Sequence, residues 1–309
     1  MESHAAAEAS PRRRWSGRHF GAALAAALGT ALMVWLAAAV HDESVTSRRQ
    51  AQWLSERARA HTFVLEPGPS PAIRFPGPGP FDERFGYHGL PQMLERLDGQ
   101  GYAVTTQARM SPAMLDWNAR GFYDLYREKA QAGLTLQDCQ GAFVHEARYP
   151  ERVYRDFADV PPVLVAALLF IEDRKLLDSP ATRNPALDWA RFGKASFDQL
   201  LHLVDPSRAA AGGSTLATQI EKYRHSPGGR TAGARDKLHQ MASASLRAYI
   251  DGEDTLARRR QIVVDYLNTV PLSARAGFGA VHGLGDALWA WYGRDFDETS
   301  HLLAAPVPE

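Results

Sequence analysis

An uncharged segment from Phe20 to Val40 is the feature that most limits how this chain can fold. As a helix its 21 residues would be about 31 Å long, which matches a hydrocarbon core of roughly 30 Å. Four arginines precede the segment, and the acidic residues Asp42 and Glu43 follow it after one histidine. Because positive flanks stay in the cytoplasm, we expect residues 1–19 to form a cytoplasmic tail, 20–40 a single-pass anchor, and the rest of the chain to lie outside the cytoplasm.

A cleaved signal peptide is the alternative interpretation of this segment. Ala37–Ala39 resembles the small-residue site at which such peptides are cut. The apolar stretch is longer than the usual signal core of about 7–15 residues, however, and this length favours an uncleaved anchor.

The composition is that of a globular protein. The 309 residues include 35 basic and 35 acidic side chains, and 45% are hydrophobic, which excludes a disordered chain and a basic nucleic-acid binder. A single cysteine, Cys139, excludes an internal disulfide framework and a cysteine-cluster metal site. The charges are segregated, because residues 222–260 hold nine basic and four acidic side chains.

Three regions follow the anchor. Residues 41–80 are expected to form a polar helix and a linker rich in proline and glycine. Residues 81–150 mix short helical and strand patterns and contain a hairpin pattern over 134–145, which predicts a small α+β module. Residues 151–309 predict an α-rich domain, with helices near 163–171, 187–203, 214–224, 234–250 and 255–268.

The run from Val163 to Ile171 is apolar on every side, so we expect this helix to be buried all round. Glu172 follows the run directly. A carboxylate at the edge of an apolar core and at a helix C-terminus is unfavourable, and enzymes use such groups as general bases. The alternative is a Glu172 that pairs with a nearby arginine at a solvated helix end.

A second candidate is the segment Gly212–Lys222, which begins Gly-Gly-Ser-Thr. Two glycines free the backbone, Ser214 or Thr215 caps a helix, and the exposed N–H groups of a helix N-terminus attract anions. Lys222 and Arg230 follow, so the pattern indicates a phosphate or diphosphate site. An ordinary capped helix with solvated arginines is the alternative.

The order of these features resembles the family 51 glycosyltransferases. These are the peptidoglycan polymerases found as monofunctional transglycosylases and as transglycosylase domains of class A penicillin-binding proteins. The resemblance covers roughly residues 135–303 and is carried by Glu172-Asp173-Arg174, Gly212–Lys222, Arg230, Tyr266-Leu267-Asn268 and Ala287–Gly293.

The resemblance implies a mainly α, lysozyme-like glycosyltransferase domain over 151–309, on the periplasmic face of a bacterial inner membrane. Its substrate would be lipid II, and its partners the growing glycan strand, membrane lipids and other cell-wall synthesis proteins. Glu172 would deprotonate the acceptor hydroxyl, and the anomeric carbon would be inverted. A divalent metal ion, Mg²⁺ or Mn²⁺, is the candidate cofactor at the diphosphate, with no protein ligands assigned. The implied substrate-binding residues are Asp173, Arg174, Ser214, Thr215, Gln219, Lys222, Arg230 and Asn268.

Several positions depart from the family pattern. Thr218 replaces the first of two paired glutamines, and Val264 replaces a glutamate. The second catalytic glutamate has no counterpart, because its helix offers Gln240 or His239. These departures define the alternative of a catalytically degenerate relative that binds lipid-linked glycan or acts as a scaffold. A lysozyme-like glycan-cleaving enzyme is a third hypothesis. The family's last helices would extend past Glu309, which adds the alternative of a truncated domain.

Overall fold

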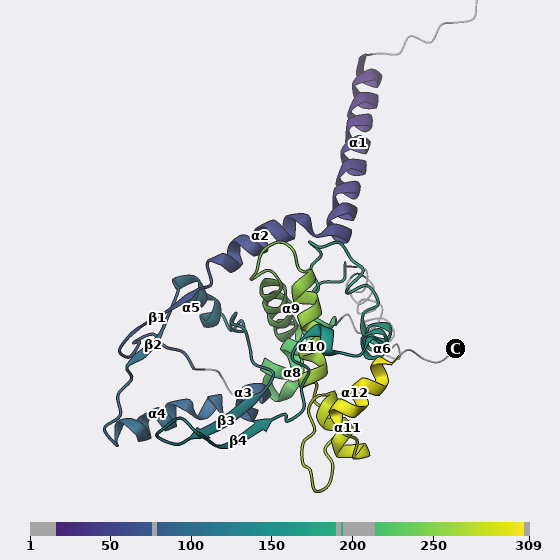
Figure 1. The fold of residues 1–309 in the computed structure, drawn as a ribbon. Helices are drawn as coiled ribbons and strands as arrows, with labels where there is room; N and C mark the ends of the chain where they lie inside the picture. Colours follow the sequence, from purple (N-terminus) through teal and green to yellow (C-terminus); the bar gives the residue numbers. More distant parts are fainter. Residues whose placement is uncertain (1–16, 76–78, 190–192, 194–213, 306–309) are drawn as a thin grey trace, which may run out of the picture. The chain divides into compact units, whose positions relative to one another are not determined.

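The computed structural model describes residues 17–75, 79–189, 193 and 214–305 (Figure 1). The chain divides into two compact units between Ser44 and Val45. The described helices and short 3-10 turns are α1 (Gly17–Thr46), α2 (Arg48–Arg59), α3 (Pro80–Arg84), η1 (Tyr87–Gly89), α4 (Leu90–Asp98), α5 (Pro112–Ala119), η2 (Phe157–Asp159), α6 (Pro162–Glu172), α8 (Leu216–His225), η3 (Pro227–Gly229), α9 (Ala234–Ala248), α10 (Leu256–Thr269), α11 (Leu284–Tyr292) and α12 (Phe296–Ala304). The described strands are β1 (Phe63–Pro67), β2 (Thr106–Met110), β3 (Ala132–Gln137) and β4 (Phe143–Tyr149).

The N-terminal helix α1 covers the whole uncharged segment and continues to Thr46. From Leu24 onward it is long and apolar enough to cross a membrane, and none of its most apolar stretch is buried. Ser47 then takes a left-handed backbone conformation, with φ of 53°, and α2 begins at the next residue. The polar helix expected after the anchor is therefore α2, and it is separated from α1 by Ser47.

The strands form two separate antiparallel ribbons. In one ribbon β1 pairs with β2, from Phe63 opposite Met110 to Pro67 opposite Thr106. In the other, β3 and β4 form the predicted hairpin. The Asp138 carboxylate closes its turn by accepting from two backbone N–H groups, those of residues 140 and 142. The ribbons and the short helices around them confirm a small α+β part beside a mainly α fold.

The core of the α-rich part lies between α8 and α10, which pack directly on one another (Figure 1). Leu216 and Ile220 of α8 and Val263 and Leu267 of α10 are buried in this core. Because each pair is separated by four residues, each helix presents one apolar face to the other.

The predicted helices of the α-rich domain are largely confirmed. Those near 214–224, 234–250 and 255–268 correspond to α8, α9 and α10. Most of the helix expected at 187–203 lies outside the described residues.

The structure corrects the expectation for α6. Leu164 and Leu168 are partly buried, and they turn one face of the helix toward the core. On its other face Val163, Phe170 and Ile171 are exposed by 46%, 64% and 75%. The described elements pack on only one side of this helix, so the expectation of burial all round is wrong for the part of the chain that the structure describes.

Candidate active site

The segment from Ser214 to Lys222 forms the start and the first turns of α8. Thr215 is the N-cap, and it forms a reciprocal capping box with Thr218. The backbone N–H of Thr215 donates to Thr218 Oγ1 at 2.9 Å, and the backbone N–H of Thr218 donates to Thr215 Oγ1 at 3.4 Å. The helix-capping role is therefore confirmed for Thr215, whereas Gly212 and Gly213 lie outside the described residues.

Glu172, the last residue of α6, lies against Gln219 of α8. Gln219 Nε2 donates to Glu172 Oε2 at 2.7 Å, and Tyr266 of α10 donates its hydroxyl to Gln219 Oε1 at 3.4 Å. Burial, and then the charge of Glu172, raise the pKa of Tyr266, so its hydroxyl stays a donor. The chain Tyr266–Gln219–Glu172 therefore orients the carboxylate of Glu172 from two neighbouring helices.

The other two residues of the Glu172-Asp173-Arg174 triplet have different surroundings. Asp173 follows α6 and is buried, and with Thr215 it lines a small cavity that Arg259 also lines. Arg174 is exposed, and its Nε donates to the backbone oxygen of Phe170 at 3.1 Å. The guanidinium of Arg174 lies 4.0 Å from the centre of the Phe170 ring.

Two lysines lie at α8: Lys222 is in the last turn of the helix, and Lys237 contacts Ser214 just before the helix begins. Lys222 is three residues after Gln219, so both side chains share one face of the helix. Lys237 of α9 donates from Nζ to Ser214 Oγ at 2.8 Å. Burial, and then the positive charge of Lys222, lower the pKa of Lys237. Sequence reasoning did not single out Lys237, although it belongs to the cationic stretch 222–260.

Two buried amides have structural partners. Asn268 accepts from the backbone N–H of Tyr154 at 2.9 Å and donates to the backbone oxygen of Tyr154 at 2.7 Å. Both bonds fix the chain before α6 to the end of α10. Gln240 is fully buried, and its Nε2 donates to the hydroxyls of Ser226 at 2.9 Å and Thr231 at 3.0 Å.

Arg230 lies beyond the C-terminal end of α8, after η3. It lines a pocket with Arg84 and His282. None of the other substrate-binding residues predicted from the sequence lines this pocket.

A buried ionic network fixes the C-terminal half of α8. The carboxylate of Glu128 lies 2.7 Å from Arg224, 2.6 Å from His225 and 3.2 Å from Arg247, and that of Glu221 lies 2.7 Å from Arg247. Burial alone would lower the pKa of His225, but Glu128 and its neighbouring carboxylates raise it to about 9. Sequence reasoning missed this network, because its members are distant in the chain.

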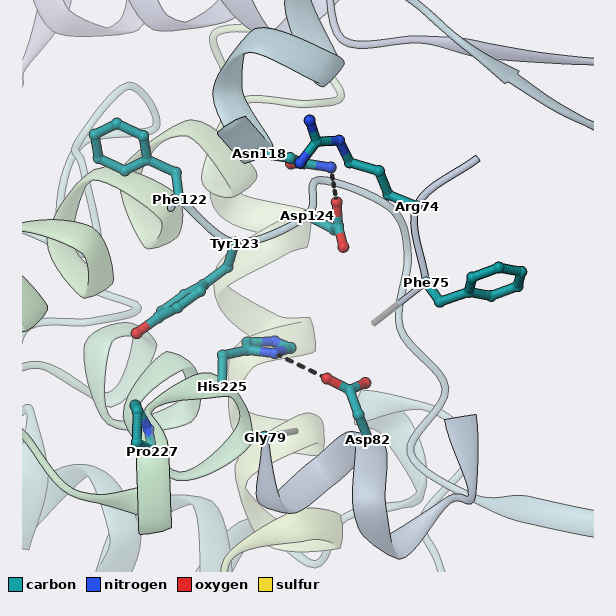
Figure 2. A pocket seen from close by; sticks show the side chains of 10 residues that line it. All are labelled: Arg74, Phe75, Gly79, Asp82, Asn118, Phe122, Tyr123, Asp124, His225 and Pro227. Atoms are coloured by element: carbon teal, nitrogen blue, oxygen red, sulfur yellow. Dashed lines mark hydrogen bonds and ion pairs between the residues drawn. The ribbon is translucent and has the colours of Figure 1, made fainter. Parts of the chain in front are cut away.

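A pocket of about 450 Å³ opens beside this network (Figure 2). In it Asp82 Oδ2 lies 3.8 Å from His225 Nδ1, and Asn118 donates to the carboxylate of Asp124. Burial raises the pKa of Asp124. None of the site residues predicted from the sequence lines this pocket, so it is separate from the candidate active site.

The described residues do not form a metal-binding site from their own side chains. No group of three or more histidine, cysteine, aspartate or glutamate side chains lies close enough to hold one in the regions that the structure describes. The divalent metal therefore stays a prediction, and no step below runs through it.

The comparisons with known proteins agree with the order of the motifs. A family model described as "Transglycosylase" matches residues 140–305, which is more than half of the chain. No curated protein matches the chain. The matched region contains the ends of α6 and α8 that meet at Glu172 and Gln219. The chain therefore belongs to the transglycosylase family, the family 51 peptidoglycan glycosyltransferase domains.

Proposed function

We propose that this chain is a membrane-anchored peptidoglycan glycosyltransferase that polymerises lipid II into glycan strands. The observation that carries the proposal is the Glu172 carboxylate held by Gln219, on the same face of α8 as Lys222. A base and a cation in one site are what a reaction with a diphosphate leaving group requires. In this proposal residues 20–40 of α1 are the anchor, residues 1–19 are cytoplasmic and the catalytic domain is periplasmic.

Glu172 is the general base. Its carboxylate takes the proton from the 4-hydroxyl of the acceptor sugar while that oxygen attacks the anomeric carbon of the donor. The bond from this carbon to the diphosphate oxygen breaks, so the anomeric configuration is inverted and the diphosphate leaves with the electron pair. Gln219 fixes the direction of the carboxylate, and Tyr266 fixes the amide of Gln219.

The ammonium groups of Lys222 and Lys237 stabilise the negative charge that develops on the leaving diphosphate. Lys237 bonds to Ser214, which places its charge beside the N-terminal end of α8. The lowered pKa of Lys237 reflects burial and a neighbouring like charge, and a bound anion would offset both. Backbone N–H groups at the start of α8, which Thr215 caps, add to the same field.

Purified full-length protein in detergent, incubated with labelled lipid II, tests the proposal. Glu172→Gln keeps the shape of the side chain and removes the base, so polymer formation should fall by about 10²-fold or more. The matched control is Glu253→Gln, an exposed carboxylate before α10, which should leave the rate unchanged.

Polymer formation by Glu172→Gln at the native rate would overturn the assignment of the base. A native protein that binds lipid II but forms no polymer would overturn the enzyme in favour of the degenerate, glycan-binding relative. Release of sugar fragments from finished glycan strands would instead support a lysozyme-like cleaving enzyme.

A further inference from the structure

The pocket of about 450 Å³ beside the ionic network contains two carboxylates (Figure 2). Asp82 reaches it from α3, and Asp124 reaches it from the segment that follows α5. In Figure 2 the two side chains point toward one another across the space beside His225. His225 Nδ1 lies 3.8 Å from Asp82 Oδ2, and the charge of His225 also acts on Asp124. Both carboxylates therefore belong to one pocket around His225.

These carboxylates and the amide beside them have unused acceptors. Asp82 is only 4% exposed, and its Oδ1 has no hydrogen-bond partner among the described residues. Asn118 donates from Nδ2 to Asp124, but the Oδ1 of the same amide is buried and also has no described partner. Burial raises the pKa of Asp124, against the hydrogen bond from Asn118 and the charge of His225. Buried acceptors without donors are unfavourable, so the pocket favours a ligand that donates hydrogen bonds and carries a positive charge.

The two cations that line the pocket do not supply the missing donors. His225 directs Nδ1 toward Oδ2 of Asp82, and its Nε2 lies 2.6 Å from the carboxylate of Glu128. Arg74 is exposed, and no hydrogen bond or ion pair joins its side chain to another described residue. Water and salt therefore screen the charge of Arg74. The Oδ1 atoms of Asp82 and Asn118 stay available to a ligand.

The backbone holds both carboxylates in place. Gly79 is the N-cap of α3, and a Cβ atom there would lie 2.8 Å from the backbone oxygen of Arg224. Only glycine allows this approach, which holds α3 and its Asp82 against the end of α8. On the other side, Arg247 donates to the backbone oxygen of Asp124 at 2.6 Å. The acceptors are therefore positioned before a ligand arrives, which lowers the cost of binding.

We propose that this pocket binds the primary ammonium group of an organic ligand, with Asp82, Asp124 and Asn118 as its acceptors. An ammonium group carries three donors, one for each of these side chains. The rings of Phe75 and Tyr123 line the same pocket and suit an alkyl chain, and the volume lies in the range of about 300–1,000 Å³ for small organic ligands. A metal ion fits less well, because Mg²⁺ and Ca²⁺ take about six or more oxygen ligands and the described walls hold only two carboxylates.

Isothermal titration calorimetry of the full chain in detergent with Nα-acetyl-lysine N-methylamide tests this proposal. We expect saturable binding that Asp82→Asn and Asp124→Asn each weaken about ten-fold or more, because each variant removes a charge-assisted hydrogen bond. Nα-acetyl-norleucine N-methylamide has a similar chain without the ammonium group and should not bind. The matched control Asp98→Asn changes an exposed carboxylate of α4, and its affinity should stay within about two-fold of the native value.

Two further probes, pentylamine and magnesium chloride, distinguish the source and the class of the ligand. Aspartate-dependent binding of pentylamine, with or without the lysine derivative, identifies a free amine. Binding of the lysine derivative alone identifies a lysine side chain of a peptide or protein. Failure of both amines to bind, equal binding of the norleucine derivative, or binding that neither aspartate variant changes overturns the proposal. Binding of Mg²⁺ that requires both aspartates, without binding of either amine, overturns it in favour of a metal site.

The second aspartate variant protects the test against misfolding. Asp82→Asn also changes a contact of the buried His225, whereas an amide at position 124 keeps a hydrogen-bonding partner in Asn118. Asp124→Asn should therefore fold even where Asp82→Asn does not, and near-UV circular dichroism checks the fold of both. Polymerisation is not the readout, so the result is independent of the proposed enzyme.

Discussion

Replacing Glu128 by glutamine removes one negative charge from the buried ionic network and changes little in shape. The Glu128 side chain is only 3% exposed and lies within 3.2 Å of two arginines and a histidine. After the substitution the closest carboxylates to Arg224 and His225 would be 3.8 to 3.9 Å away. Two largely buried cations would then be poorly compensated.

The size of the effect follows from this burial. Removing one partner of a buried ion pair costs about 3–5 kcal/mol in the free energy of unfolding. For a domain of this size each kcal/mol lowers Tm by roughly 2–4 °C, so Glu128→Gln should lower Tm by about 6–20 °C. Without Glu128 the pKa of His225 should fall from about 9, and release of its proton limits the loss.

Thermal unfolding of the full chain in detergent, followed by near-UV circular dichroism, measures this change. The control is Asp116→Asn, which breaks an exposed 2.8 Å ion pair with Arg120 whose side chains are 60% and 64% exposed. Such a pair contributes less than about 1 kcal/mol, so Tm should fall by less than roughly 4 °C. Equal Tm values for the two variants would refute the reasoning that Glu128 neutralises a buried cluster.

Three further predictions concern α8 and its neighbours. The pKa of His225 is raised to about 9 from 6.5. The charged His225 therefore contributes its full stabilisation below pH 6.5, and this stabilisation is lost as the pH rises through about 9. In urea unfolding from pH 6 to 10, the free energy of unfolding should decline in the native protein and not in His225→Gln. Gln240→Glu should lower the free energy of unfolding by about 1–3 kcal/mol, because the two hydrogen bonds that the buried amide donates are lost. Polymerisation should be no faster than in the native protein. A faster enzyme of native stability would contradict this prediction. Thr215→Ala removes the N-cap of α8 and should lower the free energy of unfolding in urea by about 1 kcal/mol. An unchanged free energy of unfolding would contradict this prediction.

Local patterns in the sequence were enough to locate most of the helices and the candidate base. The spacing of apolar residues predicted α8, α9 and α10 because helical periodicity depends only on near neighbours. The Gly-Gly-Ser-Thr pattern located the capped start of α8 for the same reason. The burial of α6 was predicted wrongly, because an apolar surface does not show which of its sides has a partner.

The sequence alone also determined that 222–260 carries an excess of positive charge, since a sum along the chain requires no contacts. Only the tertiary structure decided how those charges are used. Lys237 bonds to Ser214 beside the candidate active site, Arg247 is buried against Glu128, and Arg230 lies with Arg84 in another pocket. These partners come from other parts of the chain, and the low dielectric that strengthens such contacts exists only after those parts have packed together.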